Sequence, residues 1–110
     1  MRKEYLHNNI QIILPAQSPS PEIPSPEIIA DGLVGLLTAR CGGCTSWSAR
    51  GEWEGPGSKW FREEVTVYEA SSTDPLFDLA DEMASYLLDV TDEEAIYIKV
   101  NNQAIIFHRE

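Results

Sequence analysis

The chain has 110 residues, 43% of them hydrophobic and 24% charged, which predicts one globular domain over 1–110 with no room for a second core. Eighteen acidic side chains against eight basic ones give a formal net charge of −10, which disfavours direct binding to nucleic acid. No apolar run reaches the roughly 18 residues of a membrane-spanning helix, and two cysteines cannot build a disulfide framework. We therefore expect a cytoplasmic protein with no signal peptide and no membrane contact.

The first predicted element is a strand over residues 5–14, in which Leu6, Ile10, Ile12 and Leu14 fall on one side with a period of two. Its polar middle, Asn8 and Asn9, favours a place at the edge of the sheet. Residues 15–26 hold five of the seven prolines, so backbone donors are missing there and we expect an extended loop or linker. A recognition segment for a proline-binding groove is the alternative.

A helix is predicted over residues 27–40, because its leucines and isoleucines recur at helical spacing after a typical start at Ser25-Pro26. Gly42 and Gly43 are expected to end it, since a left-handed glycine satisfies the last carbonyl groups.

Two strands, over 44–53 and from about 61 to 70, are predicted to form a hairpin around the Gly55-Pro56-Gly57-Ser58 turn. Trp53 and Trp60 flank this turn and are expected to pair across the strands, whereas Trp47 is expected in the core.

The second helix is predicted from an N-cap at Asp74 to Val90, with one apolar stripe along it. Two short β-branched runs, 93–100 and 103–108, are joined by Asn101-Asn102 and predict a tight hairpin. The resulting order predicts an α+β fold of the ferredoxin-like βαββαβ plan with an added C-terminal strand. Both helices should then lie on one face of an antiparallel sheet.

Cys41 and Cys44 form a Cys-x-x-Cys pattern, but here the predicted helix precedes the pair, so its dipole has the wrong sign for activating a thiolate. Three interpretations of the two cysteines remain: a structural helix cap, a reversible disulfide and a metal site. His7 and His108 fall on different strands, and no nucleophile lies beside either in the sequence. We therefore predict no catalytic residue, no metal site and no cofactor, and expect that the protein is not an enzyme.

Negative charge is concentrated in residues 63–98, which carry eleven acids and no base. Four of these acids follow helical spacing on the exposed side of the second helix: Asp78, Asp81, Glu82 and Asp89. An acidic surface that keeps the protein soluble is one interpretation. A docking face for a protein with a basic surface, including imitation of nucleic acid by an inhibitor, is the second, and divalent-ion binding is the third.

Trp53 and Trp60 have charged neighbours and are expected to be half exposed, either as interface anchors or as a cover for the end of the sheet. The sequence thus predicts a non-enzymatic interaction or regulatory protein. Its partner-binding residues would be the four acids of the second helix together with Trp53 and Trp60.

One segment resembles a class of short uncharacterised ferredoxin-like domains whose first helix ends in Gly-Gly-x-Thr and leads to Gly-x-Trp: Cys41-Gly-Gly-Cys-Thr45, followed by Gly51-Glu-Trp53. In topology it is also similar to the PII-like signalling proteins, trimers that bind nucleotides between subunits. Over residues 27–107 the resemblance implies the fold, a tendency to oligomerise, and small-molecule sensing as an alternative function. The loop 55–59 is shorter than a PII-type ligand loop and the second half lacks phosphate-binding bases, so no binding residue is carried over.

Overall fold

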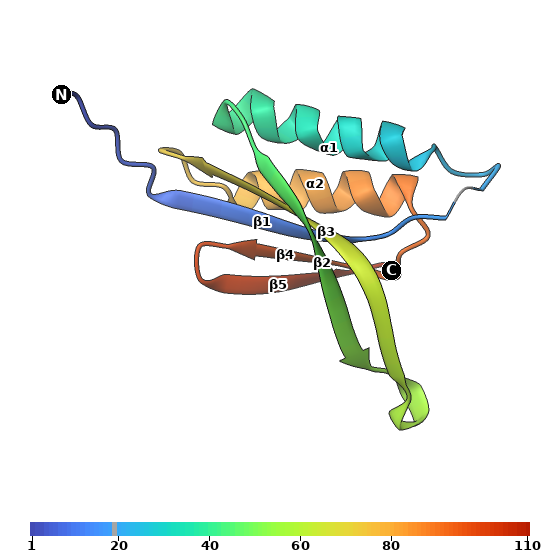
Figure 1. Cartoon of the computed structure of the whole chain (residues 1–110). Helices are drawn as coiled ribbons and strands as arrows, with labels where there is room; N and C mark the ends of the chain where they lie inside the picture. The colour runs from blue at the N-terminus through green and yellow to red at the C-terminus, as the bar shows by residue number, and fades with distance from the viewer. Residues whose placement is uncertain (19) are drawn as a thin grey trace.

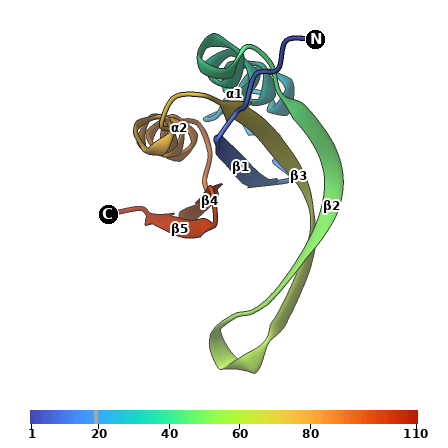
Figure 2. The ribbon, with the colours of Figure 1, turned by 90° about the vertical axis from the view of Figure 1, so that its left-hand side faces the viewer.

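Five antiparallel strands and two helices make up the fold in the computed structural model, which describes residues 1–18 and 20–110. The elements are β1 (Asn8–Pro15), α1 (Pro26–Cys41), β2 (Thr45–Glu54), the short 3-10 turn η1 (Pro56–Ser58), β3 (Trp60–Ser72), α2 (Phe77–Val90), β4 (Ala95–Val100) and β5 (Gln103–His108). The sheet order is β2-β3-β1-β4-β5. Both helices lie on one face of the sheet (Figures 1 and 2), which confirms the predicted α+β arrangement.

β1 lies at the centre of the sheet, between β3 and β4, so its predicted edge position is wrong. The asparagines that favoured an edge occupy the first two positions of the strand, not its middle. The side-chain amide of Asn9 donates to the carbonyl of Ala70 at 3.3 Å and to the hydroxyl of Ser71 at 3.0 Å. A polar side chain is tolerated there because the neighbouring strand satisfies it.

The hydrophobic core fills the space between the helices and one face of the sheet. Alternate residues of β1 point into it, and α1 and α2 cover them with side chains at helical spacing; the fully buried ones include Ile10, Ile12, Leu33, Leu37, Leu79, Met83 and Leu87. The hydroxyl of Tyr86 on α2 donates to the carbonyl of Ile29 on α1 at 3.0 Å, which ties the helices together. Within the described part of the chain, neither helix has the length and apolar character that crossing a bilayer demands.

The two helices differ in how closely their ends match the prediction. The Ser25 side chain accepts from the Ile28 N–H, and Gly42 ends α1 in the left-handed region at φ 82°, as expected. α2 begins only at Phe77, so the predicted N-cap at Asp74 is wrong. The N–H of Asp74 donates to the hydroxyl of Ser72, and this turn carries the chain out of β3 before the helix can start.

The predicted loop 15–26 is shorter in the structure, because Pro15 is paired in β1 and Pro26 is the first residue of α1. Residue 19, within this segment, lies outside the described residues.

β2 and β3 extend well beyond the rest of the sheet as a two-stranded ribbon, here called the arm (residues 50–64). β3 pairs with β1 only between Val65 and Ser72, whereas β2 and β3 stay paired as far as Glu54 and Trp60. The arm curves below the sheet, away from the helices (Figure 2). The longest extent of the molecule is 54 Å and its radius of gyration is 14.8 Å, against about 13 Å for a compact chain of this length.

The tryptophans of β2 and β3 are placed differently from the prediction. Trp53 lies opposite Phe61, not Trp60, and its ring stacks on that of Phe61 with 6.2 Å between centroids. Trp60 is 73% exposed. Trp47 is 43% exposed, not in the core, because it shares the face of the sheet that the helices leave open.

Candidate functional site

Two hollows of similar size lie on different sides of the sheet. One is a groove of about 760 Å³ between α2 and the C-terminal end of β5. The other is a cavity of about 780 Å³ on the face of the sheet without helices, between the arm and the β4–β5 hairpin, here called the open-face cavity.

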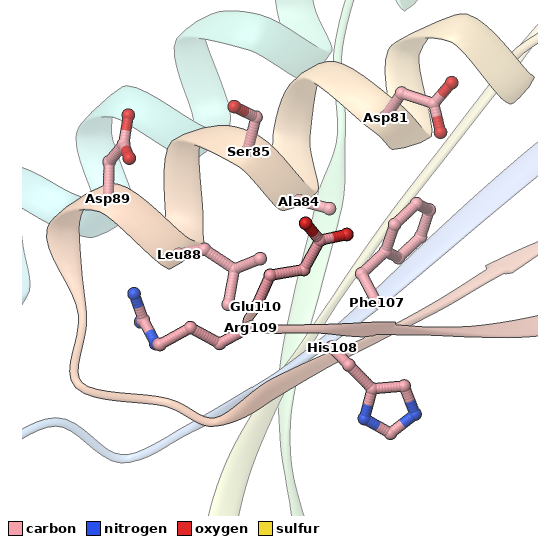
Figure 3. A pocket seen from close by; sticks show the side chains of 9 residues that line it. All are labelled: Asp81, Ala84, Ser85, Leu88, Asp89, Phe107, His108, Arg109 and Glu110. Atoms are coloured by element: carbon pink, nitrogen blue, oxygen red, sulfur yellow. The ribbon is translucent and has the colours of Figure 1, made fainter.

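The groove beside α2 brings together few groups that could act on one ligand. Asp81, Ser85 and Asp89 line its helix side, while His108 points away from the helix, to the other side of β5 (Figure 3). Arg109 is engaged elsewhere, since its guanidinium donates to the carbonyls of Thr91 and Glu93. His108 is thus not placed to act with the carboxylates of α2.

The open-face cavity is built by the alternation of side chains along the strands. Ile13 lies opposite Tyr97, and Tyr97 lies opposite Ile106, so all three share the open face. Trp53 and Val65 complete the apolar and aromatic walls from the arm side. Apolar walls of this kind are typical of a small-molecule site.

Five carboxylates line the same cavity: Glu52, Glu63, Asp92, Glu93 and Glu94. Among the residues that the structure describes, no lysine or arginine lines it. Glu52 is ion-paired with Arg50 at 3.2 Å and with Arg62 at 3.3 Å. Within residues 1–18 and 20–110, Glu63 and Glu93 form no ion pair. The cavity therefore presents unneutralised negative charge beside aromatic rings.

Glu93 is half-buried at the border of the cavity. Partial burial raises its pKa above the ordinary value, and the negative charge of Glu63 raises it further. A half-buried carboxylate that faces a second carboxylate attracts a cation more strongly than either group would in water.

The predicted partner-binding residues fall into separate places. Asp81, Glu82 and Asp89 are exposed on α2, as predicted, whereas Trp53 and Trp60 belong to the arm. Asp78 is exposed but not free, because Arg40 donates to both of its carboxylate oxygens, at 2.9 and 3.2 Å. The structure thus does not join the six residues into one surface.

The Arg40–Asp78 pair predicts a pH-dependent contribution to stability. The hydrogen bond from Arg40 holds the pKa of Asp78 below its ordinary value of 3.8. The native state therefore gains stability above pH 3.8, and this gain is lost as the pH falls through the lowered pKa. Asp78→Asn should lower the melting temperature at pH 7 and have no effect below the lowered pKa.

Asp89→Asn is the matched control for Asp78→Asn on the same helix. Asp89 lies near the C-terminal end of α2, where the helix dipole disfavours an anion, so its removal should leave the melting temperature unchanged or raise it. Equal losses in both variants, in thermal denaturation followed by circular dichroism, would contradict the role of the ion pair.

Cys41 and Cys44 are free thiols and both are partly buried. Burial raises the pKa of the Cys41 thiol, which lowers its reactivity at neutral pH. Among residues 1–18 and 20–110, no three histidines, cysteines or carboxylates are arranged to hold a metal ion. Cys41 is the last residue of α1, which Gly42 caps, and Cys44 directly precedes β2.

Sequence reasoning missed the open-face cavity, including Glu63, Glu93 and Tyr97. The signal in the sequence was the apolar character of the side chains on the face of each strand that points away from the core. Ile13, Tyr97 and Ile106 are apolar at positions that alternate with the core residues, where a solvated sheet face would be polar.

Comparison with known proteins identifies the fold but no family. No protein-family model matches the chain, and no curated protein matches it. Two similar solved structures are a phage SAM lyase in complex with S-methyl-5′-thioadenosine, with a TM-score of 0.70, and a phage SAM lyase in the apo state, with a TM-score of 0.66. Each is 8% identical in sequence, and the match covers 100% of this chain and 96% of the other.

This likeness shows the fold, and it contradicts the prediction that the protein is not an enzyme, because the matching solved structures are those of a lyase. That prediction depended on the lack of a paired nucleophile and base in the sequence. The resemblance to PII-like proteins stays a prediction, since no family model matches the chain.

Proposed function

We propose that the protein binds S-adenosylmethionine in the open-face cavity and cleaves it as a lyase. The observation that carries the proposal is the combination of aromatic walls with unpaired carboxylates, which suits an organic cation that bears an aromatic group.

S-adenosylmethionine matches both features of the cavity. Its adenine can stack on an aromatic ring such as Trp53 or Tyr97, and its positively charged sulfur is attracted by Glu63 and Glu93. A cavity of about 780 Å³ lies within the range of roughly 300–1,000 Å³ that is typical of small-molecule sites. The phage SAM lyase with the same fold supports the choice of ligand.

The chemistry of the reaction also fits apolar walls. Conversion of S-adenosylmethionine to S-methyl-5′-thioadenosine breaks the bond between sulfur and the aminobutyrate chain and leaves its electron pair on sulfur, so the sulfonium charge disappears. The carbon that leaves sulfur gains a bond from the carboxylate oxygen of the same chain, which closes a lactone, so no second reactant is consumed. Apolar walls favour a step in which charge is lost, while the carboxylates supply the initial binding.

Incubation with S-adenosylmethionine, followed by chromatography of the nucleosides, tests the proposal. We expect S-methyl-5′-thioadenosine to accumulate in proportion to protein concentration. We also expect the uncharged thioether S-adenosylhomocysteine to raise the melting temperature less than S-adenosylmethionine does. Binding without product would favour a small-molecule sensor, and the absence of both binding and product would overturn the proposal.

A second candidate function is docking of a protein with a basic surface on α2, favoured by the exposure of Asp81, Glu82 and Asp89. In the described part of the chain none of the three forms an ion pair. The triple variant Asp81→Asn, Glu82→Gln, Asp89→Asn should capture fewer basic proteins from a lysate, with the largest difference at low salt. Equal capture at low salt would contradict this function.

A further inference from the structure

β5 is an edge strand of the sheet, and in the described part of the chain it pairs only with β4. The N–H of Arg109 donates to the carbonyl of Glu94 at 2.9 Å, on the side of β5 that faces β4. Backbone groups alternate between the two sides of a strand, so those of Ile106 and His108 point to the other side. The outer edge of β5 therefore presents N–H and carbonyl groups that could pair with a further strand.

This edge lacks the features that normally protect an edge strand, which are charged side chains and prolines. β2, at the opposite edge of the sheet, carries Arg50, Glu52 and Glu54. β5 instead has an unbroken apolar run over 104–107 and contains no proline, acid, lysine or arginine. An apolar edge of this kind favours the addition of a strand from another molecule.

The groove beside α2 follows the end of this edge. α2 lies over the β4–β5 hairpin (Figure 2), and the groove of about 760 Å³ lies between α2 and β5. Its apolar lining consists of Ala84 and Leu88 from α2 and Phe107 from β5, whose ring points toward the helix (Figure 3). An extended chain beside β5 would thus cover apolar surface as well as form backbone hydrogen bonds.

The helix side of the groove is acidic. Asp81, Ser85 and Asp89 follow one another there at intervals of about one helical turn. Both aspartates are exposed, and among the residues that the structure describes neither forms an ion pair. Glu110 adds a third carboxylate, while the guanidinium of Arg109 is held by backbone carbonyls of the segment before β4. The charge of the groove therefore suits a basic occupant.

The spacing of the two aspartates also suits an extended chain. Asp81 and Asp89 are separated by about 12 Å along the helix axis, and four residues of a strand span about 13 Å. Side chains on one face of a strand recur at every second residue. Two side chains four residues apart can thus face the two aspartates, and the side chain midway between them faces Leu88 and Phe107.

We propose that an extended basic segment of another protein adds as a further strand along the outer edge of β5. Two of its lysine or arginine side chains, four residues apart, pair with Asp81 and Asp89, and an apolar side chain between them packs on Leu88 and Phe107. A second copy of β5 is a poorer occupant, because it would bring two acidic α2 helices together. The inference rests on the second candidate function for the basic character of the partner, and it needs no S-adenosylmethionine.

Fluorescence anisotropy of a labelled peptide with the full chain tests the inference. The capped peptide Thr-Val-Thr-Lys-Thr-Leu-Thr-Lys-Thr presents both lysines and the leucine on one face of a strand. Its isomer Thr-Val-Thr-Thr-Lys-Leu-Thr-Lys-Thr has the same composition but places the lysines on opposite faces. We expect the first peptide to bind, and the isomer to bind at least tenfold more weakly. Absence of binding by the first peptide at low salt, or equal binding of the two, would overturn the inference.

Variants of the protein test the position of the peptide. The double variant Asp81→Asn, Asp89→Asn should bind the first peptide at least tenfold more weakly than wild type. The control Asp31→Asn, Glu82→Gln makes the same change in charge at two exposed acids that do not line the groove, and it should bind as wild type does. All four side chains are exposed, so the fold should persist, which circular dichroism checks. Equal losses in the two double variants would contradict the groove as the site.

Methylation of the peptide backbone separates strand addition from docking on α2 alone. Only alternate N–H groups of an added strand face β5, so methylating that set should abolish binding, whereas methylating the other set should be tolerated. The charges are the same in both methylated peptides. Equal effects of the two methylations would overturn strand addition. In that case, weaker capture of basic proteins by the triple variant of α2 would still support the second candidate function, so the two can fail separately.

Discussion

Glu93→Gln should weaken binding of S-adenosylmethionine by about ten- to a hundredfold and, at the same time, raise the melting temperature of the free protein. The affinity falls because the variant lacks the partly desolvated carboxylate that attracts the positive charge of the ligand. An interaction of this kind contributes roughly 1.5–3 kcal/mol to binding. The gain in stability follows because the ionised Glu93 is partly buried and faces Glu63.

The pH dependence of this variant has a definite sign. Since the folded state raises the pKa of Glu93 above 4.5, ionising it costs stability as the pH rises from 4.5 through the raised value. The stability advantage of Glu93→Gln should therefore be largest at pH 7 and vanish below pH 4.5.

Glu82→Gln is the matched control, because it makes the same chemical change on the exposed side of α2. Calorimetric titration and thermal denaturation should find its affinity and stability close to wild type. If Glu93→Gln bound S-adenosylmethionine as tightly as Glu82→Gln, the carboxylate would not recognise the ligand.

Gly32→Ala should destabilise the protein by about 1–3 kcal/mol, although alanine is the better helix former. A methyl group at Gly32 would overlap the hydroxyl and ring of Tyr86. The ring would have to move, and its hydrogen bond to the Ile29 carbonyl, worth roughly 1 kcal/mol, would be lost.

Gly35, one turn along the same helix, is the control for Gly32. A methyl group there meets nothing within 4 Å, so Gly35→Ala should stabilise the protein by up to about 1 kcal/mol. Urea denaturation measures both changes. Stabilisation by both substitutions would show that α1 and α2 are not held in contact by Tyr86.

Elements with clear local signals were predictable from the sequence. The apolar stripe of α2 and the Asn101 turn between β4 and β5 lie where the pattern predicted them, and Asn101 adopts φ 55°. The central position of β1 was not predictable locally, because the groups that satisfy Asn9 come from residues 70 and 71. Strand order is a property of the whole fold.

The pairing of Trp53 with Phe61 shows how a short turn limits prediction. A change of register by one residue moves a side chain to the other face of the ribbon, and the Gly-Pro-Gly-Ser turn allowed more than one register.

The candidate site was harder to predict than the fold, because its residues are far apart in the sequence. Trp53, Glu63 and Glu93 come from β2, β3 and the segment before β4, and only the sheet topology brings them to one cavity. The acidic residues 92–94 were recognised as charge, but nothing local showed that they border apolar walls.

The most direct test of the open-face cavity is a titration with S-adenosylmethionine followed by ¹H–¹⁵N nuclear magnetic resonance. The indole N–H of Trp53 and the backbone amides of Tyr97 and Ile106 should shift together and saturate, while those of Asp81 and Ser85 beside α2 should not. Shifts centred on the groove beside α2, or no shifts at saturating ligand, would contradict the open-face site.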